Sequence, residues 1–202
     1  MLLKLQEINA KASSEEDKFV PGPLPTVGIN HYDVNIATSA DKEREDINSA
    51  TRCFPFLIGS LSKPTDYFLS IREFGGALAP AWQSYLRSTL ESCDGKKCGI
   101  VFLVDISCAS RFAEAGVHLL DTLSFFEHDS KSTTKVLIVF SKSDLLDPCS
   151  REKTLTEVTS LLRLDYLSNW CQYCQLERVV FSSETEEGLG FIFNWLRALY
   201  FS

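Results

Sequence analysis

Two long apolar runs dominate the second half of the chain. They are GIVFLVD at residues 99–105 and KVLIVFS at residues 135–141. Because both runs are continuous rather than alternating, they predict strands that are covered on both faces in a parallel sheet. Between them we expect a helix capped by Ser110, because apolar residues recur there at helical spacing. This apolar stripe consists of Phe112, Gly116, Leu119, Leu120 and Leu123. Strand, helix and strand in this order predict a βαβ unit.

The rest of the second half continues the alternation of helix and strand. A helix is expected from about Ser150, followed by a short strand at residues 178–181. A last helix is expected with Thr185 as its cap and with Glu186 and Glu187 in its first turn. The apolar positions are Leu155, Val158 and Leu162 in the first of these helices, and Leu189, Ile192, Phe193, Leu196 and Leu199 in the second. The alternation predicts the α/β fold class, with a mostly parallel sheet and helices on both faces.

The first half of the chain is organised differently. Residues 31–37 and 67–73 each favour a strand, and a long charged connection joins them instead of a helix. We therefore expect an antiparallel pair of strands. We interpret residues 38–65 as an insertion in this hairpin. Because domains of roughly 100–200 residues are usual, we expect residues 1–202 to form a single domain.

Charge and composition exclude several classes of function. Twenty basic and 27 acidic side chains give a net charge of −7, which disfavours nucleic acid as a partner. The longest apolar runs are far shorter than the roughly 20 residues of a membrane-spanning helix, so we expect no integral membrane segment. Seven cysteines without an export signal indicate reduced thiols. We therefore expect a cytoplasmic protein, and we expect it to be a monomer.

A polar quartet, SKSD, directly follows the second apolar run. Ser141, Lys142, Ser143 and Asp144 stand at the carboxyl end of a predicted strand, where open α/β sheets bind ligands. A carboxylate such as that of Asp144 can accept two N–H groups from the edge of a guanine, while the stem of Lys142 packs along the base. A plain polar turn after a strand is the competing interpretation.

A second polar loop follows the last predicted strand. Ser182, Ser183 and Glu184 come directly after Phe181. The backbone N–H groups of this loop can meet a purine base from the other side, and we assign that of Ser183 to the base carbonyl. Two such loops, in this order along the chain, predict one purine site formed by both.

Two earlier segments carry candidate ligands for phosphate and metal. In REFGG, the paired glycines Gly75 and Gly76 permit close approach of the backbone to a phosphate, and Glu73 can hold a magnesium-bound water. In PTVGIN, the hydroxyl of Thr26 can ligate magnesium. The competing interpretations are a plain turn for REFGG and a linker for PTVGIN.

Taken together, these segments resemble the ADP-ribosylation-factor-like small GTPases. The resemblance covers most of residues 26–196 and rests on PTVGIN, REFGG with APAWQSYL, GIVFLVD, VFSKSD, and FSSETEEGL with NWL. It implies a Ras-like fold that binds GTP or GDP with Mg²⁺, and switch segments that present the nucleotide state to effector or regulatory proteins. It also implies a regulatory role in membrane or ciliary traffic.

The resemblance further implies roles for single residues. Thr26 lies in switch I and shares the magnesium site with Glu73, while Gly76 offers its N–H to the γ-phosphate. Glu73 and Ser141 depart from the Asp and Asn that are usual in the family. Ala77 occupies the place of the glutamine that orients the attacking water. We therefore expect hydrolysis to be very weak or absent, and we assign no catalytic residue.

The largest departure from that family is a missing motif. No GxxxxGK[ST] phosphate loop occurs in the 202 residues, and residues 1–10 resemble the helix that follows this loop. Charge-assisted hydrogen bonds contribute about 1.5–3 kcal/mol each, so the loss of four costs about 6–12 kcal/mol, or about four to eight decades of affinity. We therefore expect impaired nucleotide binding and an incomplete domain without its first strand. We hypothesise that the sequence is a truncated product. Reading the coding frame upstream of Met1 tests this hypothesis.

Two other classes of function stay open. The first is a nucleotide-free pseudo-GTPase that binds proteins through its switch-like surface, with Phe74, Trp82 and Tyr85 as contact residues. The second is a zinc or thiol protein, because a CxxC pair and a looser second pair supply thiolates of the kind that zinc binds. The four candidate ligands are Cys93, Cys98, Cys171 and Cys174.

Overall fold

The computed structural model describes residues 29–35, 68–93, 98–127, 134–170 and 174–201. The chain divides into two compact units, one of residues 1–24 and 30–73 and the other of residues 25–29 and 74–202. The single domain expected from the sequence stays a prediction.

Two paired strands make up nearly all of the described part of the first unit. β1 (Ile29–Asn35) and β2 (Phe68–Phe74) form a two-stranded sheet. His31 Nε2 lies 2.5 Å from Ser70 Oγ, so a polar contact joins the two strands. The predicted pairing of the two strands is confirmed, although the observed bounds differ from the predicted ones by one or two residues; their antiparallel direction stays a prediction. The predicted insertion at residues 38–65 lies outside the described residues.

A three-stranded parallel sheet forms the centre of the second unit. Its strands are β3 (Gly99–Asp105), β4 (Thr134–Ser141) and β5 (Cys174–Val180), in the order β3-β4-β5. Asp105 is opposite Ser141, and Phe140 is opposite Val180. The carboxyl ends of all three strands therefore lie at one end of the sheet. Both predicted apolar strands are confirmed, whereas β5 begins earlier than the short strand that the sequence predicted.

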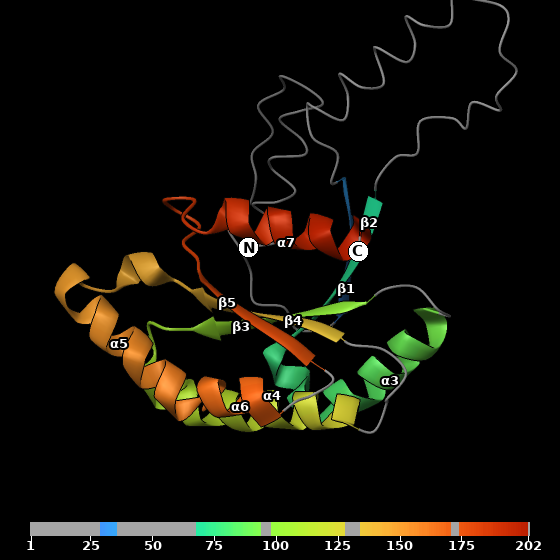
Figure 1. Cartoon of the computed structure of the whole chain (residues 1–202), viewed down its shortest axis with the longest axis horizontal. Coiled ribbons are helices and arrows are strands. Elements are labelled where there is room, and N and C mark those ends of the chain that lie inside the picture. Colours follow the sequence, from blue (N-terminus) through green and yellow to red (C-terminus); the bar gives the residue numbers. More distant parts are fainter. Residues whose placement is uncertain (1–28, 36–67, 94–97, 128–133, 171–173, 202) are drawn as a thin grey trace, which may run out of the picture. The chain divides into compact units, whose positions relative to one another are not determined.

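Helices cover both faces of this sheet. In Figure 1, α7 (Leu189–Phe201) lies on one side, and α4 (Phe112–Glu127), α5 (Pro148–Leu161) and α6 (Leu164–Trp170) lie on the other. The remaining elements of the unit are η2 (Gly76–Ala81), α3 (Trp82–Cys93), η3 (Ala109–Arg111) and η4 (Ser143–Leu145). The predicted α/β fold class, with a parallel sheet between helices, is confirmed for this unit.

The side chains of β4 explain why the sheet needs cover on both sides. Val136, Ile138 and Phe140 belong to the buried core that also contains apolar residues of α4, α5 and α6. On the opposite face, Leu137 and Val139 are also fully buried. A strand with two buried faces has no polar alternation, which is why its sequence is a continuous apolar run.

The predicted start of α4 and one of its core positions are wrong. Ser110 caps no helix, because it lies inside the 3₁₀ turn η3 that precedes α4. Leu120 is 42% exposed, whereas Thr122 is buried in its place. Thr122 tolerates burial because its hydroxyl donates to the carbonyl of His118 at 2.7 Å.

The starts of α5 and α7 also differ from the prediction. α5 begins at Pro148, because the side chain of Asp147 caps it and proline suits the first helical position. Thr185 does not cap α7, and Glu187 lies outside its first turn. The chain turns instead at Gly188, whose φ of 76° is left-handed, and the helix begins at the next residue.

The sheet of the described residues has an edge at β3. Within the described ranges, β3 pairs with β4 alone, and Leu103 on it is 48% exposed. This agrees with an α/β sheet that lacks its first strand. No helix within the same ranges is long and apolar enough to cross a membrane.

Candidate functional site

The SKSD loop (residues 141–144) leaves β4 through a left-handed residue. The hydroxyl of Ser141 donates to the carbonyl of Val104 at 3.1 Å, which ties the start of the loop to β3. Lys142 has φ 63° and ψ 37°, a conformation that costs a non-glycine residue about 1–2 kcal/mol. Ser143 is buried, while Asp144 is exposed. The loop therefore holds Ser143 inside and leaves the Asp144 carboxylate accessible at the end of the sheet.

The SSE loop (residues 182–184) follows directly on Phe181, which is hydrogen-bonded to the SKSD loop. The carbonyl of Phe181 accepts from the N–H of Ser143 at 3.4 Å and from its hydroxyl at 3.3 Å. Within the SSE loop, the hydroxyl of Ser182 accepts from the N–H groups of Glu184 and Thr185, each at 3.2 Å. The structure thus brings together the two loops that the sequence assigns to a purine base.

An ion pair that the sequence did not reveal joins the SKSD loop to the end of β3. Lys142 Nζ lies 2.6 Å from Asp105 Oδ2. The other oxygen of Asp105 accepts from the N–H and the hydroxyl of Ser107, at 3.0 and 2.6 Å. Burial opposes ionisation of Asp105, but the hydrogen bonds from Lys142 and Ser107 and the Lys142 charge outweigh it, so the pKa of Asp105 lies below its ordinary value. Asp105 is therefore a carboxylate that holds Lys142 in place.

A second charged contact that sequence reasoning missed joins α5 to the segment before α7. Arg151 Nη2 lies 2.5 Å from both carboxylate oxygens of Glu187. The hydroxyl of Ser143 lies 3.3 Å from one of these oxygens, and the N–H of Ser182 donates to the carbonyl of Glu187 at 3.2 Å. Glu187 therefore contacts the SKSD loop and the SSE loop, which we call the base loops, and the helix α5.

The turn at residues 75–76 follows β2 and is held by an indole. The carbonyl of Gly75 accepts from the N–H of Leu78 at 2.9 Å and from Trp82 Nε1 at 3.2 Å. Gly76 is exposed, and a Cβ built on it would meet no heavy atom within 4 Å. Ala77, which follows it, is also exposed. Gly76 therefore lies on an open, exposed turn.

The aromatic residues beside this turn pack against each other and against the core. Trp82 contacts Phe102 edge-on, with ring centroids 6.0 Å apart, and lies 5.5 Å from the ring of His118. Phe74 and Tyr85 stack with their centroids 5.6 Å apart. Trp82 is thus an anchor of the turn, and its indole N–H is already bonded to Gly75.

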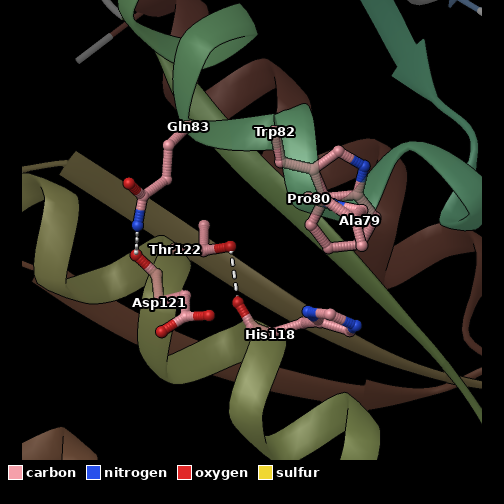
Figure 2. A pocket seen from close by; sticks show the side chains of 7 residues that line it. All are labelled: Ala79, Pro80, Trp82, Gln83, His118, Asp121 and Thr122. Atoms are coloured by element: carbon pink, nitrogen blue, oxygen red, sulfur yellow. Dashed lines mark hydrogen bonds between the residues drawn. The ribbon is translucent and has the colours of Figure 1, made fainter.

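A pocket of about 230 Å³ lies between this segment and α4. In Figure 2 the ring of His118 lies below Trp82, and Gln83 reaches towards Asp121, whose backbone carbonyl accepts from Gln83 Nε2 at 3.4 Å. The lining residues are Ala79, Pro80, Trp82, Gln83, His118, Asp121 and Thr122. None of the residues of the two base loops lines it, so it is a separate feature of the second unit.

The predicted magnesium site is described only in part. Thr26 lies outside the described residues, and Glu73 is a half-buried residue of β2 in the first unit. Only one of the two predicted magnesium ligands is therefore described, and their shared site stays a prediction.

The four cysteines of the zinc alternative are only partly described. Cys171 and the side chain of Cys93 lie outside the described residues. Cys98 precedes β3 and Cys174 begins β5, with β4 between them. Two strand spacings separate their backbones by about 10 Å, at the amino end of the sheet. Among the described residues no group of three or more His, Cys, Asp or Glu is placed to hold a metal ion.

Comparisons with known proteins relate most of the second unit to one family. Residues 60–199 match the family model described as the ADP-ribosylation factor family. The chain is also similar to the human protein ADP-ribosylation factor-like protein 16, with 30% identity over 133 residues, which is 65% of this chain. The chain spans 59% of the length of that relative. The matched range of the family model contains both base loops and the turn at residues 75–76.

Proposed function

Because the chain belongs to the ADP-ribosylation factor family, we propose that it recognises guanine nucleotides through the SKSD and SSE loops. The observation that carries this proposal is the attachment of the SKSD loop to the residue that precedes the SSE loop, in which the carbonyl of Phe181 accepts two hydrogen bonds from Ser143. A base bound at this end of the sheet has residues of both loops within reach.

The donors and acceptors of the two loops suit guanine. The exposed carboxylate of Asp144 accepts the ring N–H and the amino group of the base, which adenine does not offer together. The hydroxyl of Ser182 accepts within its own loop, and its N–H donates to Glu187. The N–H of Ser183 is therefore the donor that we assign to the base carbonyl. Lys142, held by Asp105, lies along the base through its aliphatic stem.

We propose that the site binds the phosphate groups more weakly than the base. Members of the family generally bind GTP or GDP with Mg²⁺. The open N–H of Gly76 suits a γ-phosphate, and Thr26 with Glu73 is our assignment for magnesium. However, the 202 residues contain no GxxxxGK[ST] motif, which supplies most of the charge-assisted hydrogen bonds to phosphate in such proteins. We therefore propose that these residues bind GDP weakly.

In the cell, we propose a regulatory switch in membrane or ciliary traffic that binds effector or regulatory proteins. The family relationship supports this role. A second candidate is a nucleotide-free interaction module of the same fold, which is favoured by Ala77 at the position assigned to the catalytic glutamine. Both candidates predict protein partners, and only the first predicts a preference for guanine.

The proposed function is tested by the nucleotide preference of the purified chain. Because the expected affinity is low, binding of GDP, IDP and ADP is measured by ligand-observed NMR titration up to millimolar concentrations. We expect GDP to bind at least about tenfold more tightly than ADP, since two hydrogen bonds to a carboxylate distinguish the bases. Equal binding of GDP and ADP, or binding of neither, contradicts guanine recognition and favours the nucleotide-free module.

A further inference from the structure

We propose that Arg151 and Glu187 are positioning residues for guanine recognition, which fix the SKSD loop against the SSE loop. This inference rests on the proposed function. The carboxylate of Glu187 binds Arg151 through both oxygens, at 2.5 Å each, and one of these oxygens also lies 3.3 Å from the hydroxyl of Ser143. We call these three residues the loop clamp.

The loop clamp reaches the base-contacting residues through their immediate neighbours. Ser143 stands between Lys142 and Asp144, the two residues assigned to guanine in the SKSD loop. The carbonyl of Glu187 accepts from the N–H of Ser182 at 3.2 Å, next to Ser183. One glutamate therefore contacts the SKSD loop through its side chain and the SSE loop through its backbone.

Backbone conformation explains why the loops need such support. Lys142 and Glu186 are non-glycine residues with φ of 63° and 59°, and each is adjacent in sequence to a member of the loop clamp. A left-handed conformation at such residues persists only where the surrounding contacts determine it. Removing the contacts of Glu187 thus gives both loops access to other conformations.

The loop clamp is partly exposed, so it is expected to position the two loops while adding little to the stability of the fold. The side chain of Arg151 is 32% exposed and that of Glu187 is 42% exposed, so solvent screens their attraction. The core of the unit lies in the apolar residues of the sheet and helices. Breaking the ion pair is therefore expected to loosen the loops while the unit stays folded.

The test compares Glu187→Gln and Arg151→Gln with the control Glu157→Gln, which removes one negative charge from an exposed position on α5. The ratio of the GDP and IDP dissociation constants is measured for each variant, because IDP lacks the amino group that Asp144 accepts. We expect this preference for GDP to fall about fivefold in both clamp variants and to stay unchanged in the control. The reversed pair Arg151→Glu with Glu187→Arg is expected to restore it in part, because the ion pair forms again but the acceptor of the Ser143 hydroxyl is lost.

A second readout keeps the inference separable from the proposed function. Hydrogen exchange of the Ser143 amide, whose N–H donates to Phe181, is expected to speed up about fivefold in Glu187→Gln and not in Glu157→Gln. An unchanged exchange rate and an unchanged GDP preference overturn the loop clamp while guanine recognition stands. A parent chain without preference for GDP overturns the proposed function, and with it the guanine role of the clamp, even if exchange at Ser143 responds.

Discussion

The two nucleotide-contacting regions assigned in the second unit are held by different kinds of contact. The base loops are held together by the hydrogen bonds of Ser143 to Phe181, the residue before the SSE loop, and by Glu187, which accepts from Ser143 and Ser182. The turn at residues 75–76 depends on the indole of Trp82, which donates to Gly75. A guanine base is the same in GDP and GTP, so its loops benefit from rigidity. A turn that is proposed to respond to the γ-phosphate must be able to move.

The largest difference between the two regions is expected in the stability lost when a glycine in each is replaced by alanine. Gly188→Ala places a Cβ 2.0 Å from the carbonyl oxygen of Val180 at a residue with φ 76°. The backbone must shift at the start of α7, so we expect the free energy of unfolding to fall by about 3–5 kcal/mol. The matched variant Gly76→Ala meets no heavy atom within 4 Å, and we expect a change below about 0.5 kcal/mol. Urea denaturation of both variants measures the difference, and equal losses of stability would refute it.

The next largest effect is expected in nucleotide affinity when Asp144 of the SKSD loop is replaced. Asp144→Asn replaces the carboxylate that we propose accepts two N–H groups of guanine, so we expect affinity for GDP to fall about 100-fold. Xanthine has a carbonyl where guanine has its amino group, and an amide can donate to it, so affinity for XDP is expected to rise. Asp165→Asn, which alters a strongly exposed carboxylate on α6, is the control. NMR titrations with both nucleotides measure the change, and a parallel loss for GDP and XDP argues against direct contact with the base.

The comparison also shows what the sequence could predict. The apolar runs of β3 and β4 and the polar loops after β4 and β5 were predicted because each depends on residues that are adjacent in the chain. The helix starts at Pro148 and Leu189 were missed because a side-chain cap at Asp147 and a left-handed Gly188 decide them. At the start of α7 this local geometry overrides Thr185, which the sequence predicted as the cap.

The contacts that hold the base loops together could not be predicted from the sequence. Arg151 and Glu187 are separated by 36 residues, and Lys142 and Asp105 by 37. No spacing rule links such positions, and each charge taken alone resembles an ordinary surface residue. Only the parallel register of β3, β4 and β5 places the ends of these strands side by side.

A smaller effect is expected where the turn at residues 75–76 meets Trp82. Trp82→Phe keeps most of the ring packing but removes the N–H that donates to the carbonyl of the buried residue Gly75. The loss of one such hydrogen bond is worth about 1 kcal/mol, so exchange of the Leu78 amide, which shares this acceptor, is expected to speed up about fivefold. Exchange at Ser143 is expected to stay unchanged.

Trp195→Phe provides a matched control for this variant. The indole N–H of Trp195 is buried and has no hydrogen-bond partner among the described residues, so its removal breaks no comparable contact. If exchange at Leu78 responds equally to both tryptophan variants, general loosening of the core explains the result, and the indole does not specifically hold the turn.

The smallest effect is expected at the ion pair of Asp105 with Lys142, and it depends on pH. Because the folded-state pKa of Asp105 lies below its unfolded value of 3.8, the charged form stabilises the fold above that pH, and this contribution is lost as the pH falls through the folded-state pKa. The Asp105 side chain is 33% exposed, so we expect Asp105→Asn to cost less than about 1 kcal/mol at pH 7 after solvent screening. Urea denaturation at pH 7 and near pH 2.5, with Glu157→Gln as the charge control, measures the difference between the variant and the parent. That difference should shrink in acid. A difference that is the same at both pH values would show that Asp105 acts through packing. In that case the hydrogen bonds of Ser143, and not the ion pair, would stabilise the left-handed conformation of Lys142.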